Sequence, residues 1–189
     1  MARHGQTAWN VDGRFQGQAD PPLDAMGRAQ AARLGTELAA LRPNVLVSSD
    51  LLRARQTAMA LSRVCGVEMA VDTHLREVDL GGWEGLDQQQ AAERFPDEYR
   101  RWSEGDDPRR GGGETEGEAG VRVAAAIRSI IGDATDGATV VIVAHGLVIR
   151  RAMGLLGEGG TIGLAGPPPH LGNGQWMIFE VAAGDRQVT

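Results

Sequence analysis

The sequence predicts an α/β fold, a three-layer α/β/α sandwich around a mostly parallel central sheet. Two short apolar runs, 45–47 and 139–144, have the length and the continuous hydrophobicity of buried strands. A segment with helical spacing of apolar residues follows each run, and strands that alternate with helices are typical of parallel sheets. A chain of 189 residues suits one domain with a sizeable core, so we expect residues 1–189 to form a single domain.

Capping residues and helix breakers set the expected helix boundaries. Helices are expected from Asp24 to about Leu41, from Asp50 to Cys65 with Gly66 at the end, from Asp87 to before Pro96, over 99–102, from Thr115 to about Ile131, and over 147–156. Further strands are expected at 67–71 and 176–181. Segments rich in turn-forming residues are expected to be loops, with 105–113 flexible and 157–172 a candidate lid; they are 10–22, 105–113 and 157–172.

Composition excludes several classes of function. The net charge is -6, which gives no electrostatic case for binding nucleic acid or an anionic membrane. All 19 basic residues are arginine, which excludes a lysine nucleophile, and Cys65 is the single cysteine, which excludes an internal disulfide. The sequence shows neither an apolar run of membrane-spanning length nor a secretion signal ahead of its first motif, so the expected location is cytoplasmic.

The tripeptide Arg3-His4-Gly5 has the chemistry needed to handle a phosphoryl group. Imidazole is a nucleophile at neutral pH, and the planar guanidinium fork matches phosphate oxygens. Glycine lets the backbone approach an anion closely. Three residues alone are a weak signal, so the prediction depends on what the rest of the chain supplies.

Two further candidates follow predicted strands. Arg53 comes shortly after strand 45–47, and His145 comes directly after strand 139–144, each ahead of or within the start of a helix. Ligands of open α/β sheets gather at the carboxyl ends of the strands, where helix N-termini attract phosphate. We therefore expect Arg53 and His145 to converge on one anion.

Each candidate also has a simpler interpretation. Arg-His-Gly can occur by chance, Arg53 can be a solvated arginine, and His145 can be a histidine with satisfied hydrogen bonds at a strand end. Glu77, within Leu75-Arg76-Glu77, reads on local sequence as a surface carboxylate. The combination favours a site, because an arginine near a helix N-terminus opposes the helix dipole unless an anion is bound there.

The ordered motifs resemble those of the histidine phosphatase superfamily, in its phosphoglycerate mutase-like branch. They cover nearly the whole chain and are Arg3-His4-Gly5-Gln6-Thr7 with Asn10, Gln16-Gly17, Ser48 to Ala54, Leu75-Arg76-Glu77, Gly113-Glu114-Thr115 and Val143-Ala144-His145-Gly146. The resemblance implies that His4 forms a phosphohistidine and that Glu77 protonates the leaving oxygen and later accepts a proton from water. It implies that Arg3, Arg53 and His145 hold the phosphoryl oxygens. Further substrate contacts are expected from Asn10, Gln16, Gly17 and Gly146, and neither a metal nor a cofactor is implied.

The activity that we favour is metal-independent hydrolysis of a phosphomonoester of a small metabolite. Segment 75–85 is similar to the phosphatase members, and the short chain leaves few residues for a cap that would keep water from the phosphohistidine. The alternatives are a cofactor-dependent phosphoglycerate mutase and a non-catalytic relative that binds phosphorylated ligands. The expected partner is a small molecule rather than nucleic acid or membrane, and a homodimer is left open.

Two segments, Gln16 to Asp20 and Gly172 to Trp176, resemble more loosely the phosphatases of glucosyl-3-phosphoglycerate. The carboxylate of a phosphoglycerate or sugar-phosphoglycerate could meet Arg109-Arg110, and a solvated pair that balances Asp106 and Asp107 is the alternative. Aromatic residues could line a sugar pocket or pack in the core; they are Trp83, Tyr99 and Trp102.

The resemblance also predicts a buried strand just ahead of Arg-His-Gly. Only Met1 and Ala2 precede Arg3, so we expect this first strand to be truncated, and a loosened His4 would follow if so short a strand did not suffice.

Overall fold

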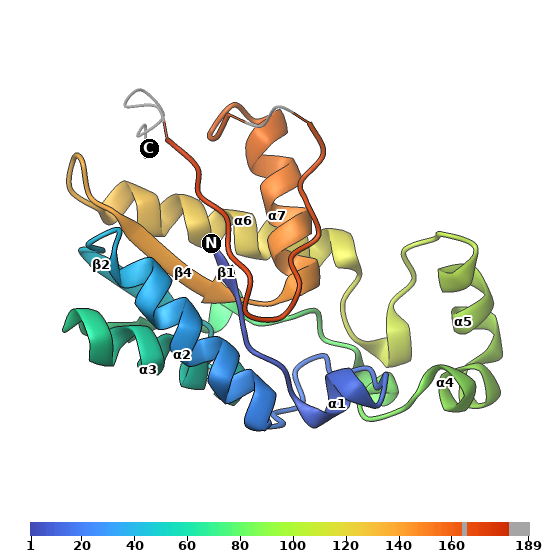
Figure 1. Cartoon of the computed structure of the whole chain (residues 1–189). Helices are drawn as coiled ribbons and strands as arrows, with labels where there is room; N and C mark the ends of the chain where they lie inside the picture. The colour runs from blue at the N-terminus through green and yellow to red at the C-terminus, as the bar shows by residue number, and fades with distance from the viewer. Residues whose placement is uncertain (164–165, 182–189) are drawn as a thin grey trace.

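A four-stranded sheet, parallel in every ladder, lies at the centre of the fold (Figure 1). Its strand order is β1-β4-β2-β3, with β1 at Ala2–Arg3, β2 at Val45–Ser48, β3 at Met69–Val71 and β4 at Val140–Ala144. The computed structural model describes residues 1–163 and 166–181, so two residues of the candidate lid 157–172 lie outside the described part.

Helices cover both faces of this sheet. One face carries α2 (Ala25–Ala39) and α3 (Leu52–Cys65), and the other carries α6 (Glu116–Asp133) and α7 (Gly146–Glu158). Side chains of successive strand residues point to opposite faces. In β4, Val141 and Val143 therefore pack with α2 and α3, while Ile142 and Ala144 pack with α6 and α7. This arrangement confirms the expected three-layer α/β/α fold with a parallel sheet.

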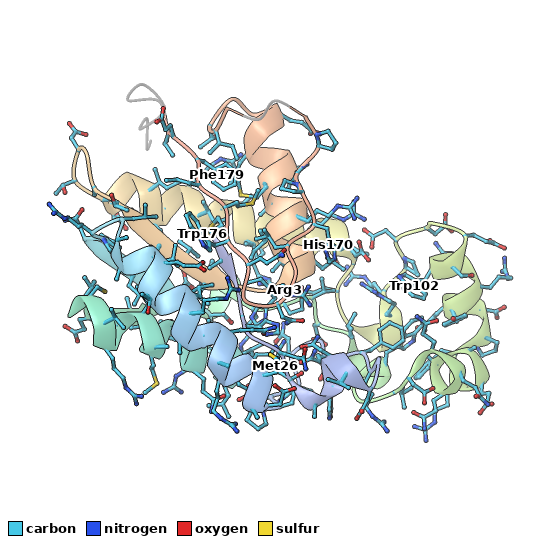
Figure 2. All side chains as sticks on the ribbon, viewed as in Figure 1. Arg3, Met26, Trp102, His170, Trp176 and Phe179 are labelled. Carbon is cyan, nitrogen blue, oxygen red and sulfur yellow. The ribbon has the colours of Figure 1, made fainter. Side chains whose placement is uncertain are left out.

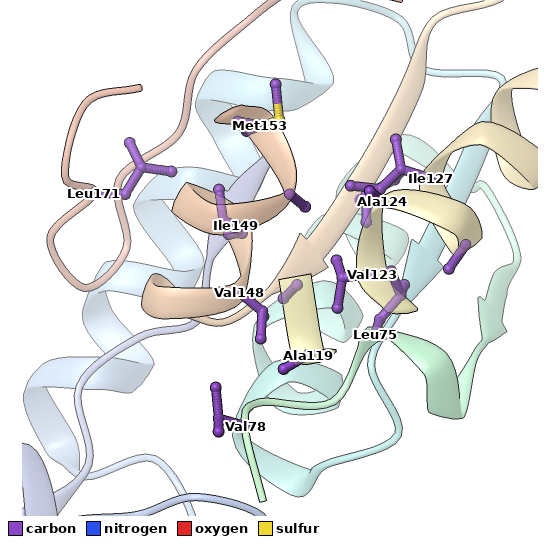
Figure 3. Close-up of a cluster of buried hydrophobic side chains, with 14 of the residues drawn as sticks. Leu75, Val78, Ala119, Val123, Ala124, Ile127, Val148, Ile149, Met153 and Leu171 are labelled. Carbon is purple, nitrogen blue, oxygen red and sulfur yellow. The ribbon is translucent and has the colours of Figure 1, made fainter. Parts of the chain in front are cut away.

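The larger core cluster lies between the sheet and the α6–α7 pair. Figure 3 shows side chains of both helices meeting there, among them Val123, Ile127, Val148 and Met153. Leu75 and Val78, which flank Glu77, are buried in the same cluster. Among the described residues, none of the helices is both long and apolar enough to span a bilayer.

The first strand has only two residues, and its other edge is covered by the C-terminal segment. The backbone N–H of Arg3 donates to Gln175 O at 2.9 Å, and Ala2 forms an antiparallel bridge with Trp176. In Figure 1 this segment runs past β1 from the opposite end of the chain. The prediction of a regular strand over 176–181 is wrong, because β1 offers too few residues to extend the ladder.

Most predicted helix boundaries are correct. Asp24 caps α2, Asp87 caps α4 (Gln88–Arg94), and Thr115 with Glu118 forms the capping box of α6. Gly66 ends α3 in the left-handed conformation, as expected of glycine after a helix. The turn expected over 99–102 is a longer helix, α5 (Pro96–Ser103).

Two local predictions are wrong. Asp50 does not cap α3: the capping position is Leu51, because the Asp50 carboxylate is bound by the guanidinium of Arg76. Asp20, from a distant loop, accepts the Leu52 N–H instead. The loop expected over 10–22 also overlaps a short helix, α1 (Ala8–Val11), which the Thr7–Asn10 capping box begins. The first error comes from a partner that is distant in sequence, whereas the capping box that begins α1 is local.

Candidate active site

A cavity of about 630 Å³ lies at the carboxyl ends of the central strands. It is lined by nearly all of the predicted site residues, namely Arg3, His4, Asn10, Gln16, Gly17, Arg53, Glu77 and Gly146. His145 is fully buried and lies behind the wall, with its ring centroid 5.2 Å from that of His4. Figure 2 shows Arg3 near the middle of the molecule and Trp102, on α5, farther out; His170 lines the same cavity.

One ring nitrogen of His4 forms a hydrogen bond within the protein, and the other is available to a ligand. Its Nδ1 lies 2.7 Å from Gly5 O, which can only accept, so Nδ1 carries the hydrogen and Nε2 keeps its lone pair. Burial, and then the charge of Arg53, holds the pKa of His4 well below its ordinary value of 6.5. The ring is therefore neutral at physiological pH, as a nucleophile must be.

The backbone of His4 is fixed by close packing around Gly5. The Gly5 N–H donates to Thr57 Oγ1 at 3.0 Å, and a Cβ on Gly5 would lie 2.4 Å from Gly27 O. Asn173, from the C-terminal segment, donates from Nδ2 to the carbonyl oxygens of His4 and Gly5 at 3.2 and 3.4 Å. Sequence reasoning assigned no role to Asn173, since nothing local links it to the N-terminal motif.

Two guanidinium groups flank His4 with hydrogen-bonding capacity left over. Arg53 is 1% exposed and donates to Ala19 O and Gly17 O, while Arg3 donates to Leu171 O. Burial lowers the pKa of Arg53 to about 10, so it stays charged at neutral pH. The Nε atoms of Arg3 and Arg53 are buried, and each is without a partner among the described residues. Buried cations with unpaired N–H groups call for an anion.

His145 also has a buried side-chain nitrogen without a partner among the described residues. Its Nε2 lies 2.9 Å from Ser49 Oγ, and its Nδ1 is buried with no partner in the described part of the chain. Burial, followed by the charge of Arg53, holds the pKa of His145 well below 6.5. Ser49 thus supports the ring of His145, a role that the sequence motif containing it did not indicate. Its position directly after β2 is the signal that could have marked it.

The carboxylate of Glu77 sits at the N-terminus of α7. Its Oε1 accepts the backbone N–H of Val148 at 3.2 Å and of Val78 at 3.1 Å, and Oε2 accepts that of Leu147 at 3.4 Å. A carboxylate at this position is favoured by the helix dipole. Glu77 also lines the cavity, so the surface-carboxylate interpretation does not describe it.

Three predicted substrate contacts also have structural partners. Asn10 Oδ1 accepts from the Thr7 N–H and from Asn173 Nδ2, and Gln16 Oε1 accepts from Thr7 Oγ1. The Gly17 carbonyl accepts from Arg53. Gly146 makes room for Arg3, because a Cβ there would lie 3.1 Å from the guanidinium carbon. The wall of the cavity is therefore tied together by the same residues that face it.

The structure separates the predicted Arg109-Arg110 pair. Arg109 is exposed, pairs with Glu118 and does not line the cavity, so of the two interpretations the solvated arginine describes it. Arg110 is buried, lines the cavity and leaves its Nε without a partner in the described residues. The segment 105–113, expected to be a flexible loop, contains a 3-10 turn at Arg110–Gly112 and is tied to α5 by the Gly111 N–H on Glu98.

The outer part of the cavity is strongly positive. Of the described residues that line the whole cavity, six are arginines and two are glutamates, Glu77 and Glu116; beyond the inner Arg3 and Arg53, the arginines are Arg14, Arg110, Arg150 and Arg151. Arg110 and Arg151 share Glu116, at 3.1 and 2.6 Å. His170, in the candidate lid segment, also lines the cavity. None of these outer residues apart from Arg110 was a sequence candidate, because none of them belongs to a recognisable sequence motif.

The three aromatic candidates divide between core and cavity. Trp83 is fully buried among Phe15, Phe95, Tyr99 and Trp102, with its indole N–H on Glu98. Packing in the core therefore describes Trp83. Trp102 lines the cavity, and the Arg110 guanidinium carbon lies 5.9 Å from the centroid of its ring.

The sequence profile of the histidine phosphatase superfamily (branch 1) matches residues 1–189. The chain belongs to this family. Among curated relatives, it is 39% identical over 166 residues to a glucosyl-3-phosphoglycerate phosphatase of Mycolicibacterium vanbaalenii, covering 83% of this chain and 73% of that one. It is 35% identical over 150 residues to a probable phosphoglycerate mutase, GpmB, of Salmonella paratyphi C, covering 79% and 69%.

Solved structures of family members agree with the fold. A mycobacterial glucosyl-3-phosphoglycerate phosphatase in complex with VO3 superposes with a TM-score of 0.75 at 36% identity, over 84% of this chain and 80% of that one. YhfR of Bacillus stearothermophilus superposes with a TM-score of 0.79 at 30% identity, over 100% of this chain and 96% of that one. Within the described residues, no group of three or more His, Cys, Asp or Glu side chains is placed to hold a metal ion.

Proposed function

We propose that this chain hydrolyses a phosphomonoester through a phosphohistidine on His4, without a metal ion. The observation that carries the proposal is a set of buried nitrogens without a partner among the described residues: Arg3 Nε and Arg53 Nε, which are donors, and His145 Nδ1, which is a donor in the tautomer whose Nε2 accepts from Ser49 Oγ. A phosphoryl group would supply the missing acceptors and balance the two guanidinium charges. The mycobacterial relatives solved with VO3 and with inorganic phosphate support this proposal.

The first step is attack by His4 Nε2 on phosphorus. The P–N bond forms as the P–O bond to the leaving group breaks, and protonated Glu77 gives its proton to the leaving oxygen. Arg3, Arg53 and His145 bind the three phosphoryl oxygens, whose charge they stabilise in a loose transition state. The Nδ1–H bond to Gly5 O holds the ring in the tautomer that this attack requires.

The second step is hydrolysis of the phosphohistidine. Ionised Glu77 takes a proton from water, the water oxygen attacks phosphorus, and the P–N bond breaks to release inorganic phosphate. The N–H groups of Leu147 and Val148 stabilise the ionised carboxylate that this step needs. One residue thus acts as acid and then as base.

The outer arginines support a substrate with a second anionic group. Glu116 balances one of the two charges of Arg110 and Arg151, and Asp12 lies 3.8 Å from Arg14, which leaves Arg150 as an additional cation lining the cavity. A phosphoglycerate or a sugar-phosphoglycerate carries a carboxylate beside its phosphoryl group and has a size that a cavity of about 630 Å³ accommodates. The name of the Mycolicibacterium relative supports the same class of substrate.

The experiment is a phosphate-release assay on p-nitrophenyl phosphate and on phosphoglycerates. His4→Ala is expected to lower turnover by at least about 10³-fold, because the nucleophile is lost. His74→Ala is the matched control, since His74 is exposed and does not line the cavity. Near-normal turnover of His4→Ala would contradict the proposal.

A mutase is the second candidate, favoured by the relative named as a probable phosphoglycerate mutase. The two activities differ in whether water or a second substrate takes the phosphoryl group. Phosphorus NMR of 3-phosphoglycerate incubated with the enzyme and a trace of 2,3-bisphosphoglycerate, which supplies the first phosphoryl group to a mutase, separates them. Inorganic phosphate as the product supports the hydrolase, and 2-phosphoglycerate without phosphate release supports the mutase.

A further inference from the structure

Arg122, on α6, makes a set of contacts that the proposed reaction does not yet use. Its Nη1 donates to the carbonyl oxygens of His74 and Arg76 at 2.8 and 3.1 Å, and its Nη2 lies 3.3 Å from Glu77 O. All three carbonyls belong to the short stretch that ends in the proposed acid. Arg122 is therefore bound to the backbone of Glu77 rather than to its side chain.

Glu114 completes the arrangement around this guanidinium. Its carboxylate accepts from Arg122 Nε at 2.9 Å and from Nη2 at 2.7 Å, in the two-point geometry that a guanidinium fork favours. The same carboxylate accepts the Asp79 N–H at 3.1 Å, and the Glu114 N–H donates to Asp79 O. The Arg122–Glu114 pair thus forms hydrogen bonds to backbone groups on both sides of Glu77. A lysine could not reproduce these contacts from one ammonium group.

The stretch that carries Glu77 has little other support for its backbone. Residues 76–80 belong to neither a strand nor a helix of the described chain. Leu75 and Val78 anchor it by packing against α6 and α7, as Figure 3 shows. Gln18 Nε2 adds one hydrogen bond to Glu77 O at 3.2 Å. Arg122 binds the carbonyl oxygens of Arg76 and Glu77, and Glu114 binds the N–H and carbonyl of Asp79, so the two residues together supply four hydrogen bonds to this backbone.

We propose that Arg122, held by Glu114, is a positioning residue that places the carboxyl group of Glu77 for proton transfer to the leaving oxygen. This inference rests on the proposed function of Glu77 and goes beyond it. General acid catalysis requires the donor within hydrogen-bond reach of the leaving oxygen, and small displacements of the donor weaken it steeply. Arg122 acts on the geometry of Glu77 and does not touch the substrate.

The test compares leaving groups, because only poor leaving groups need a proton. For 3-phosphoglycerate, an alkyl phosphate, Arg122→Ala is expected to lower kcat/KM, which reports the first step and not the later hydrolysis, by about 10- to 100-fold, because displacing the acid loses part of the roughly 10²- to 10⁴-fold that general acid catalysis contributes. For p-nitrophenyl phosphate, whose leaving group is stable as an anion, the loss is expected to stay below about 3-fold. Arg122→Lys should resemble Arg122→Ala, since it keeps the charge and loses the fork. Arg128→Ala, exposed on the same helix, is the matched control and should leave both rates unchanged.

A double-mutant cycle separates positioning from a general effect on folding. In a Glu77→Gln background, adding Arg122→Ala should lower kcat/KM for 3-phosphoglycerate by less than about 3-fold, because the group that Arg122 places is already gone. Urea unfolding shows whether each variant folds. If Arg122→Ala does not fold, Glu114→Gln replaces it in the same measurements. This variant keeps the shape of the side chain and weakens its two hydrogen bonds with Arg122.

Two different failures are distinguishable in these data. If Glu77→Gln itself lowers kcat/KM equally for both substrates, the proposed role of Glu77 as the acid of the first step is wrong. If Glu77→Gln slows 3-phosphoglycerate selectively but the Arg122 and Glu114 variants slow both substrates equally or neither, the positioning role of Arg122 is wrong.

Discussion

The imidazole rings of His4 and His145, from opposite ends of the chain, lie with their centroids 5.2 Å apart and their planes inclined at 57°. The parallel pairing of β1 with β4 produces this contact, because Arg3 pairs with Ala144 and the next residue of each strand is a histidine. Both rings are buried beside Arg53 and Arg3, so both are neutral. One can attack phosphorus and the other can hold an oxygen.

Arg110 is expected to select substrates with a second anionic group. Arg110→Met should raise KM for 3-phosphoglycerate by about 10- to 100-fold, the value of one or two hydrogen bonds to a charged group. Glu116 would keep Arg151 as its partner, so the change does not leave a carboxylate unpaired. KM for p-nitrophenyl phosphate should change by less than about 3-fold. Arg109→Met, next in sequence but outside the cavity, is the control, and an equal effect of both variants would contradict this role.

Stability is expected to fall between pH 6 and pH 5 because of the two buried histidines. Their pKa values lie well below 6.5 in the folded protein and near 6.5 in the unfolded chain, so unfolding takes up protons below pH 6.5. The stabilisation is present above pH 6.5 and is lost as the pH falls, by up to about 1.4 kcal/mol per histidine per pH unit. Urea unfolding at pH 6.0 and 5.0 measures it.

The variant His145→Gln shows how much of this pH dependence of stability comes from one of the two histidines. It should remove about half of the change in unfolding free energy between pH 6.0 and 5.0. The amino group of Met1, whose pKa burial lowers to about 6, contributes between pH 8 and 6 and so lies mostly outside this window. An unchanged slope in His145→Gln would show that other groups take up the protons.

Gly27 packs closely against the N-terminal motif, so replacing it with alanine is expected to destabilise the folded protein strongly. A Cβ on Gly27 would lie 2.0 Å from Gln6 O, and this backbone cannot move without displacing His4. Gly27→Ala should destabilise the protein by at least about 2 kcal/mol, as overpacking does. Gly154→Ala is the control, because its Cβ meets nothing closer than 3.9 Å and α7 should gain up to about 1 kcal/mol. Equal urea midpoints for the two variants would contradict the packing described.

Activity is expected to survive removal of divalent metals, because the arginines supply the positive charge that a metal ion supplies in other phosphoryl-transfer enzymes. Turnover of p-nitrophenyl phosphate before and after extended dialysis against EDTA measures this. A loss of activity that Mg²⁺ or Zn²⁺ restores would require a different mechanism.

The central layers and the inner cavity follow from local sequence signals. The apolar runs of β2 and β4, the caps at Asp24, Asp87 and Thr115, and Gly66 after α3 each carry their cause within a few residues. Because β2 and β4 are adjacent parallel strands, the residues that follow them meet at one edge. Because of that geometry, the sequence alone predicts that Arg53 and His145 lie close together.

The outer cavity and the supporting contacts could not be predicted, because their partners are distant in sequence. Asp50 resembles a helix cap until Arg76 is known to bind it, and Arg109 and Arg110 are indistinguishable in sequence although one is exposed and the other buried. Asn173 reaches the carbonyl of His4 only after the C-terminal segment crosses β1. Tertiary contacts alone decide such cases.

The most direct test of the central claim is to locate the phosphoryl group during turnover. The enzyme is mixed with substrate, quenched in alkali within milliseconds to preserve phosphohistidine, digested, and mapped by mass spectrometry. We expect a gain of one phosphoryl group on the peptide that contains His4, absent in His4→Ala and enriched in Glu77→Gln, where hydrolysis lacks its base. A phosphoryl group on another residue, or steady turnover with no labelled peptide, would contradict the account.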